Sequence, residues 1–254
     1  MKPAGKLVVL LLLVALTALC PAARAQDVFN PTGAGAPSAP ADLEADELFE
    51  EEPLEVWDPI EPFNRGMFWF NDKLYFYLLK PVARGYRAVA PEPVRTSVGN
   101  FFSNLAFPVR FVNSALQLKI GDAGNELRRF LLNSTVGVAG LFDPAKQNGW
   151  LKKEEDLGQT FGRYGVGSGF YLVMPVFGPT NLRDGVGRLG DGYLDPVPFL
   201  VPGTLEYVGV KAYDRVNALS LDKDTYEGIK REQLDPYLFI RNAYTQRREA
   251  LIEK

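Results

Sequence analysis

Side chains that commonly perform catalysis are scarce in this chain of 254 residues. It contains no histidine, and Cys20 is its one cysteine. The chain therefore lacks the histidine-dependent nucleophile systems of serine and cysteine hydrolases and the usual ligands of zinc. Ser168 lies between two glycines, but no histidine is present to activate its hydroxyl. We predict that the protein is not an enzyme and that it uses no cofactor and no metal.

Two further patterns have the spacing of functional motifs. Residues 154–156 place three carboxylates in a row, but oxygen-ligated metal sites need ligands that converge from a defined turn. We therefore expect these residues to form a solvated loop. The glycines of residues 185–190 have the spacing of a dinucleotide-binding loop, yet the polar residues 180–184 before them do not resemble a buried strand. We interpret this spacing as a chance match.

Uncharged polar side chains set among aromatic residues remain as candidates for ligand contact. Residues 62–79 contain seven aromatic residues, and Asn64 and Asn71 lie seven positions apart on one line of a helix. Pro62 suits the first helical turn, and Pro81 is expected to end the helix. Apolar side chains cover nearly the whole circumference, so this helix is either buried in a core or surrounded by lipid. Its charged residues and short length argue against a simple membrane span.

The first 25 residues have the pattern of a signal peptide. A basic start precedes an apolar stretch at residues 7–19, and Ala-Arg-Ala at residues 23–25 fits a cleavage site. Cys20 follows the apolar stretch directly, where a bacterial lipoprotein would be acylated, but the residue before it is the bulky Leu19. We therefore favour cleavage after Ala25 over lipidation at Cys20. The protein is expected to be exported and to fold without an internal disulfide.

Charge divides the mature chain into an acidic arm and a mildly basic body. Residues 26–61 contain 11 acidic residues and no basic one, whereas the rest contains 25 basic and 20 acidic residues. Residues 26–56 are also rich in proline and alanine, which predicts a disordered linker. Residues 57–254 are expected to form one helical domain. No motif for binding nucleic acid is present, and an exported protein is not expected to bind it.

The remaining pattern predicts a mainly α fold built from short helices bounded by proline. A glycine-rich stretch, residues 137–192, interrupts it, and residues 170–174 within this stretch are expected to be extended. The glycines could bring backbones close together, line a passage or form a compact loop. The predicted helix starts are Pro93, Pro108, Asp122, Thr204 and Asp235 with Pro236. The helix after Asp122 is expected to bury Leu127, Phe130, Leu131 and Val138, with Arg128 and Arg129 facing elsewhere.

Several specific motifs follow one another in a fixed order between residues 57 and 200. They are Asp58-Pro59-x-Glu61-x-x-Asn64-Arg65, Asn100-Phe101-Phe102-x-Asn104-Leu105-x-x-Pro108, Arg129-Phe130-x-x-Asn133-x-Thr135-x-Gly137-x-x-Gly140, Glu155-Asp156-x-Gly158-Gln159-Thr160 and Gly178-Pro179-x-x-Leu182-Arg183-Asp184. In this order they resemble the MlaA (VacJ) family. The final helices show a weaker similarity.

The resemblance implies an outer-membrane protein that maintains lipid asymmetry. Such proteins form a mainly helical ring in the periplasmic leaflet beside porin trimers. An amphipathic channel through the ring carries mislocalised phospholipids from the outer leaflet to a soluble periplasmic carrier. The alternative is an envelope protein that binds porins without transporting lipid. Family members are normally lipoproteins, so the residues around Cys20 and the long acidic arm depart from the pattern.

The family role suggests functions for particular side chains. A headgroup crosses hydrocarbon cheaply only along a polar route, because burying an unpaired charge costs several kcal/mol or more. The predicted polar contacts in the channel are Asn64, Asn71, Asn100 and Asn104, with helix capping and hydrogen bonds between helices as the alternative role. The predicted channel-wall residues are Tyr171, Met174 and Pro175. The predicted membrane contacts are Phe68, Trp69, Tyr75 and Phe76.

Overall fold

The structure is a computed structural model that describes residues 56–201, 203–222 and 224–254. The predicted signal peptide with Cys20, and the acidic linker up to residue 55, lie outside the described residues. The described residues from 56 onward form one compact unit. Its elements are α2 (Glu61–Leu74), the π-helical segment η1 (Tyr75–Leu79), α3 (Lys80–Val89), α4 (Glu92–Leu105), α5 (Phe107–Leu116), α6 (Ile120–Thr135), α7 (Pro144–Gln147), α8 (Leu157–Arg163), β1 (Tyr171–Met174), β2 (Gly178–Asn181), α9 (Leu182–Leu194), α10 (Val197–Leu200), α11 (Thr204–Leu221), α12 (Thr225–Glu232) and α13 (Pro236–Glu253).

The predicted mainly α fold of short helices bounded by proline is confirmed. Seven of the described helices have a proline at their first or second position, where the missing N–H leaves no hydrogen bond unmade. Asp235 caps α13 as expected, because its carboxylate accepts hydrogen bonds from the backbone N–H groups of Tyr237 and Leu238. Among the helices that the structure describes, none is both long and apolar enough to cross a membrane.

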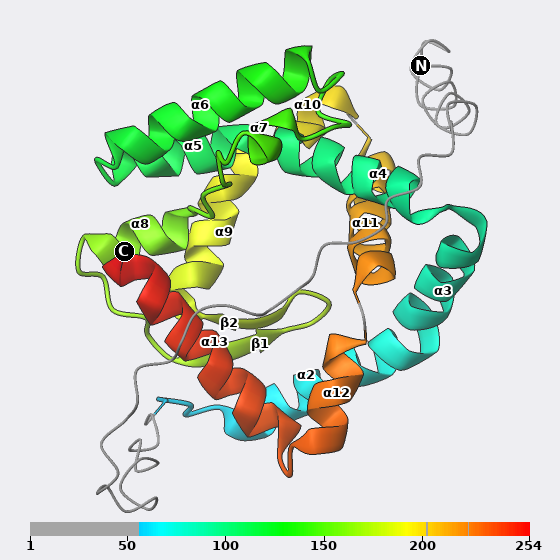
Figure 1. Cartoon of the computed structure of the whole chain (residues 1–254). Coiled ribbons are helices and arrows are strands. Elements are labelled where there is room, and N and C mark those ends of the chain that lie inside the picture. Colours follow the sequence, from blue (N-terminus) through cyan, green and yellow to red (C-terminus); the bar gives the residue numbers. More distant parts are fainter. Residues whose placement is uncertain (1–55, 202, 223) are drawn as a thin grey trace, which may run out of the picture. The chain divides into compact units, whose positions relative to one another are not determined.

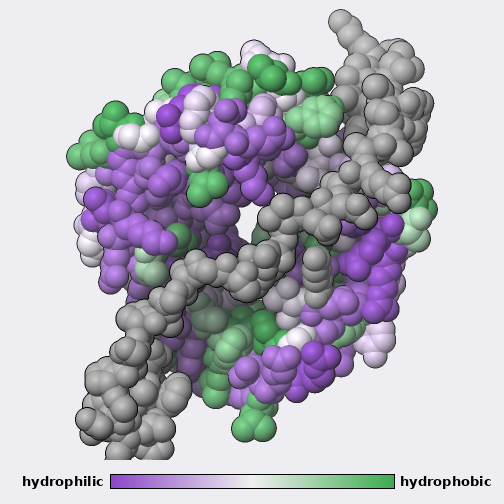
Figure 2. Space-filling view, viewed as in Figure 1, coloured by the Kyte–Doolittle hydropathy of each residue, from purple (hydrophilic) through white to green (hydrophobic). Residues whose placement is uncertain are grey.

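The helices and the small sheet are arranged as a ring. Contacts run in a closed circuit through α2, η1, α3, α11, α4, α5, α8, α13, β2 and β1, and β1 returns to α2. Figure 1 shows this circuit, with β1 and β2 along its lower side. In the space-filling view the background is visible through the middle of the ring (Figure 2). The fold is therefore organised around a central opening rather than around one apolar core.

The expectation that Pro81 ends the first helix is wrong. The chain continues without a break from α2 through η1 into α3, and Pro81 lies in the first turn of α3. Proline removes one N–H and crowds the carbonyl group one turn earlier. The wider π-helical turn accommodates this change, because Lys80 donates its backbone N–H to the carbonyl of Tyr75, five residues back.

The helix predicted after Asp122 exists, but the face that it buries is the opposite of the expected one. It begins at Ile120 with Lys119 as the N-cap, so Asp122 lies in the first turn. Its buried side chains are Ala123, Asn125, Glu126, Arg129 and Asn133. The predicted core residues Leu127, Leu131 and Val138 are exposed instead, and Phe130 is half-buried.

Glycines bring two elements of the glycine-rich stretch close together. Residues 171–174 form β1, as expected, and β1 pairs with β2 in an antiparallel hairpin. The glycine-rich stretch of residues 137–192 is nevertheless partly helical, because its last residues belong to α9. A Cβ atom at Gly187 would lie only 2.4 Å from the backbone nitrogen of Gly158, so α8 and α9 can cross at this distance only with glycine. The spacing within residues 185–190 therefore reflects helix packing.

Candidate functional site

Polar side chains fill the interior of the described residues, and large apolar side chains lie on their outside. Twenty polar or charged residues are buried in this part of the chain, compared with eight apolar ones. Thirty-one large apolar residues are exposed, which is far more than the scattered exposure usual for proteins in water. Figure 2 shows apolar patches along the outer rim, including over α6, and hydrophilic residues to the left of the central opening. This distribution is the reverse of that in a water-soluble domain.

Two of the predicted channel residues attach the hairpin to α2. The side-chain amide of Asn64 donates to the carbonyl of Tyr171 (2.9 Å) and accepts from the N–H of Val173 (2.8 Å). Seven residues farther along α2, the amide of Asn71 donates to the carbonyl of Met174 at 3.0 Å and accepts from the N–H of Val176 at 2.7 Å. Each amide therefore mimics the peptide group of a neighbouring strand. The seven-residue spacing of the asparagines matches this ladder along one helix face.

The position of Asn64 favours hydrogen bonding within the protein over contact with a ligand. Its side chain is fully buried and also donates to Asp58 at 2.8 Å. Tyr171 is buried in a small apolar cluster with Val173 and Tyr237.

The other two predicted channel-wall residues lie farther along the hairpin. Met174 is half-buried, whereas Pro175 is exposed at the start of the turn. The next two residues, Val176 and Phe177, are exposed as well. The apolar tip of the hairpin is therefore accessible, while its root is tightly bonded.

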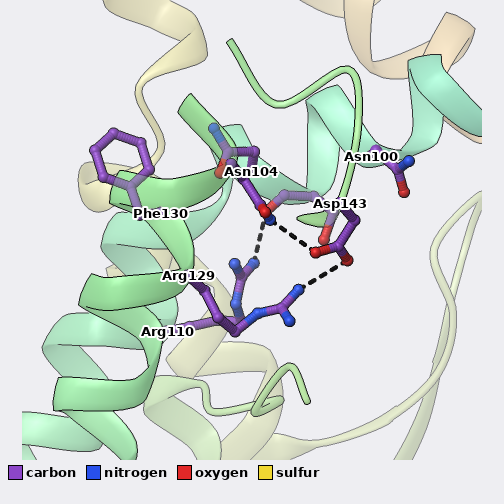
Figure 3. A pocket seen from close by; sticks show the side chains of 8 residues that line it. Asn100, Asn104, Arg110, Arg129, Phe130 and Asp143 are labelled. Atoms are coloured by element: carbon purple, nitrogen blue, oxygen red, sulfur yellow. Dashed lines mark hydrogen bonds and ion pairs between the residues drawn. The ribbon is translucent and has the colours of Figure 1, made fainter. Parts of the chain in front are cut away.

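Asn100 and Asn104 lie together beside a very small polar pocket between α4, α5, α6 and the start of α7 (Figure 3). Asn100 donates to the carbonyl of Leu141 at 3.3 Å, and Asn104 donates to the hydroxyl of Ser134 at 3.0 Å. The pocket volume is about 10 Å³. This volume is close to the minimum for one water molecule. The four predicted asparagines are therefore not brought to one site, because two are at the hairpin and two at this pocket.

The small pocket also contains paired charges. Arg129 donates to Asp143 at 2.9 Å, and Asn133 donates to the other oxygen of the same carboxylate at 2.9 Å. Burial alone would raise the pKa of Asp143, but hydrogen bonds from Lys146, Asn133 and Arg129 lower it overall. Asp143 therefore stays ionised and holds the guanidinium of Arg129 in place.

The four predicted membrane contacts differ in their surroundings. Trp69 is 62% exposed, and Lys73 lies over its ring. Phe68 packs edge-on against Tyr237, 5.8 Å between ring centres. Tyr75 and Phe76 are half-buried against Tyr226 of α12, and the hydroxyl of Tyr75 donates to Glu227. The most exposed aromatic and aliphatic side chains of this region are Phe63, Trp69, Tyr77 and Leu78.

Comparison with known proteins places this geometry in a family. Residues 56–251 match the family described as MlaA lipoprotein. The chain belongs to the MlaA family. It is 36% identical over 202 residues to the intermembrane phospholipid transport system lipoprotein MlaA of Escherichia coli (strain K12), covering 76% of this chain and 77% of that protein. An uncharacterised protein of Rickettsia felis is 36% identical over 201 residues, covering 79% of this chain and 80% of that protein.

A solved structure has the same fold as this MlaA family member. It is described as "Structural basis for maintenance of bacterial outer membrane lipid asymmetry". The two structures are similar with a TM-score of 0.69 at 34% sequence identity, over 77% of this chain and 98% of that chain. Both the sequence and the ring-shaped fold therefore support membership of the MlaA family.

This MlaA family member also buries charged side chains that were not predicted from the sequence. Arg110 pairs with the fully buried Glu126 at 2.7 Å, and the backbone N–H of Lys153 donates to the other oxygen of that carboxylate at 2.8 Å. A signal was present in the spacing of Glu126, Arg129 and Asn133, which places all three on one side of α6. The apolar residues on the other side of α6, such as Leu127 and Leu131, are exposed instead.

The expectation of a solvated loop at residues 154–156 is wrong for two of the three carboxylates. Glu155 is buried and accepts hydrogen bonds from Gln117 (2.8 Å) and Lys119 (2.9 Å). Asp156 caps α8 and forms a two-bond pair with Arg248 at 2.6 and 2.8 Å. These side chains bond to partners that are more than 30 residues away in the sequence. The local sequence pattern therefore does not reveal these contacts.

Replacing Asn64 with alanine is expected to detach β1 from α2. The change leaves the buried carbonyl of Tyr171 and the N–H of Val173 without partners, at a cost of about 2–4 kcal/mol. Thermal or denaturant unfolding of the purified protein in detergent measures this loss. The control is Asn148→Ala, which removes one exposed hydrogen bond to Pro144 and is expected to cost about 0.5 kcal/mol or less. Equal stability of the two variants would show that the hydrogen bonds of Asn64 to Tyr171 and Val173 do not stabilise the fold.

Stability is also expected to depend on the ionisation of Asp156. Burial alone would raise its pKa, but the hydrogen bonds and charge of Arg248 and the bond from Gln159 lower it below 3.8. A lowered pKa gives stability above the unfolded-state pKa, and this stability is lost as the pH falls through the folded-state pKa. The melting temperature of Asp156→Asn should therefore approach that of wild type between about pH 6 and pH 2. Glu232→Gln, at an exposed carboxylate of α12, is the control and should show no such convergence.

Proposed function

We propose that this protein is the outer-membrane component of a phospholipid transport system. In this role it removes mislocalised phospholipids from the outer leaflet and passes them to a soluble periplasmic carrier, which maintains lipid asymmetry. The E. coli relative carries the name of an intermembrane phospholipid transport system lipoprotein, and the similar solved structure concerns outer membrane lipid asymmetry. We further propose that residues 1–25 direct export, with cleavage after Ala25 favoured over acylation of Cys20.

The observation that carries this proposal is the reversed distribution of polar and apolar side chains. Exposing 31 large apolar side chains to water is costly, whereas acyl chains solvate them without this penalty. The buried polar groups would in turn be costly in an apolar core unless they were hydrogen-bonded or close to water. Both requirements are satisfied by a ring that contacts acyl chains at its rim and has a water-filled central opening. In this proposal the ring lies in the periplasmic leaflet, beside a porin trimer.

The mechanism inferred from this arrangement is physical and involves no covalent step. A phospholipid headgroup needs water or polar groups along its route, because an unpaired charge in hydrocarbon costs several kcal/mol or more. The central opening supplies that route, and the apolar hairpin tip at Val176 and Phe177 offers a surface for acyl chains. Asn64 and Asn71 hold the root of this hairpin and so act by positioning it.

If the rim contacts lipid, an acidic residue introduced there should weaken membrane association. Leu131→Asp on α6 should cost about 2.5–3.5 kcal/mol if the side chain lies deep in hydrocarbon, and less near the headgroups. Flotation of the purified protein with phospholipid vesicles measures the bound fraction. Gln147→Asp at an exposed polar position of α7 is the control and should float as wild type does. A rim in contact with water predicts equal flotation for both variants.

Loss of the protein is expected to raise the amount of phospholipid in the outer leaflet of the cell that makes it. Labelling with a membrane-impermeant amine reagent reports phosphatidylethanolamine on the outside, and re-expression of the full chain should restore the low level. Normal labelling in the deletion strain would support the alternative role, an envelope protein that binds porins without moving lipid. Release of lysophospholipid by the purified protein would instead indicate a phospholipase.

A further inference from the structure

A second pocket is lined by none of the four asparagines and by no residue of the hairpin, and it shares only Arg110 with the small polar pocket. It has a volume of about 340 Å³, which is in the range of roughly 300–1,000 Å³ typical of small-molecule sites. Residues from α5, α8, the loop before α8 and the C-terminal half of α13 form its walls. The lining residues are Arg110, Glu154, Glu155, Asp156, Gln159, Tyr244, Arg247, Arg248 and Leu251. Figure 2 shows a predominantly hydrophilic surface over this side of the ring.

The pocket is built on a rigid polar base. Arg248 holds Asp156 through two hydrogen bonds and lies 2.7 Å from a carboxylate oxygen of Asp184. The hydroxyl of Tyr244 donates to the same Asp184 carboxylate at 2.6 Å. These groups are already occupied, so their part is to fix the shape of the pocket. They are positioning residues for the groups that remain accessible.

One buried acceptor in the wall has no partner. Gln159 is 2% exposed, and its side-chain nitrogen donates to the carbonyl of Glu154 at 2.6 Å. Its side-chain oxygen has no hydrogen-bond partner among the described residues. A buried acceptor without a donor costs about 1–3 kcal/mol, so this oxygen favours a ligand that supplies an N–H or O–H group.

Arg247 contributes a positively charged side chain to the lining of the same pocket. The side chain of Arg247 is 69% exposed, and one of its terminal nitrogens bonds to Glu154 at 2.8 Å. The rest of its planar guanidinium can donate to a phosphate, the geometry for which arginine is best suited. Leu251 is half-buried and adds an apolar patch to the wall.

We infer that this pocket binds the zwitterionic headgroup of a phospholipid, with the phosphate at Arg247 and the ammonium group at the side-chain oxygen of Gln159. The lining contains three arginines and three carboxylates, so it offers no net charge to a purely anionic headgroup. A phosphoethanolamine group matches both signs at once. The inference rests on the proposed function and names the lipid class for which the ring has a specific site.

Binding of soluble headgroups to the full chain in detergent tests the inference without any transport step. Isothermal calorimetry with glycerophosphoethanolamine should give saturable binding. Glycerophosphoglycerol and inorganic phosphate should bind at least about tenfold more weakly, because an ammonium group donates a stronger, charge-assisted hydrogen bond to the unpaired acceptor than a hydroxyl group does. Equal binding of inorganic phosphate would identify the site as one for free phosphate and overturn the headgroup assignment.

Two pairs of variants separate a specific site from a general effect. Leu251→Trp fills the pocket and should abolish binding, whereas Leu234→Trp on the exposed surface should leave it unchanged. Arg247→Ala should weaken binding about fivefold, whereas Arg231→Ala removes a comparably exposed ion pair with Glu232 and should have no effect. Wild-type binding by Leu251→Trp and Arg247→Ala would overturn the inference.

Failure of headgroup binding and failure of the proposed transport function give different results. If the deletion strain accumulates outer-leaflet phospholipid but no headgroup binds, transport stands and the pocket is not a headgroup site. If glycerophosphoethanolamine binds and the deletion strain has a normal outer leaflet, the pocket recognises lipid in a protein that does not transport it.

Discussion

The structure depends on satisfying polar groups that the ring buries. Glu126, Arg129 and Asp184 lie in positions that an ordinary domain would fill with leucine or valine. Each is held by a partner from another element, such as Arg110 for Glu126 and Arg248 for Asp184. Because a buried charge without its partner is far more costly than a missing methylene group, these pairs dictate which helices can be neighbours. The apolar side chains have correspondingly little influence on the arrangement, since most of them face outward.

The same principle joins the hairpin to the helical part of the ring. β1 and β2 form only a two-stranded sheet, which is marginal by itself. Asn64 and Asn71 supply the hydrogen bonds of a third strand from a helix, and Asn64 adds a bond to Asp58. Close glycine contacts between α8 and α9 then fix the other end of the hairpin connection. The hairpin is thereby firmly held at its root and exposed at its tip.

Much of the fold could be predicted because proline and capping residues act locally. Asp235 with Pro236 identified the start of α13, and the apolar run at residues 171–174 identified β1. The orientation of the helices could not be predicted in this way, because the rule that apolar faces are buried assumes water outside. For α6 that assumption assigned Leu131 to the core and Arg129 to the surface, the reverse of the structure. The ion pairs of the candidate site could not be predicted from local sequence patterns, because partners such as Asp156 and Arg248 are 92 residues apart.

The π-helical segment η1 sets the rotation of α3 relative to α2, and each of these helices packs against a different part of the ring. Its widened turn places one additional residue between α2, which bonds to the hairpin, and α3, which packs against α11 through Tyr86 and Tyr213. If this turn became regular α-helix without losing a residue, α3 would rotate by about 100° relative to α2. Either Ala83 or Asn64 would then leave its buried position. The wide hydrogen bonding of this turn, rather than any charge on its side chains, therefore determines which faces of α2 and α3 are buried together.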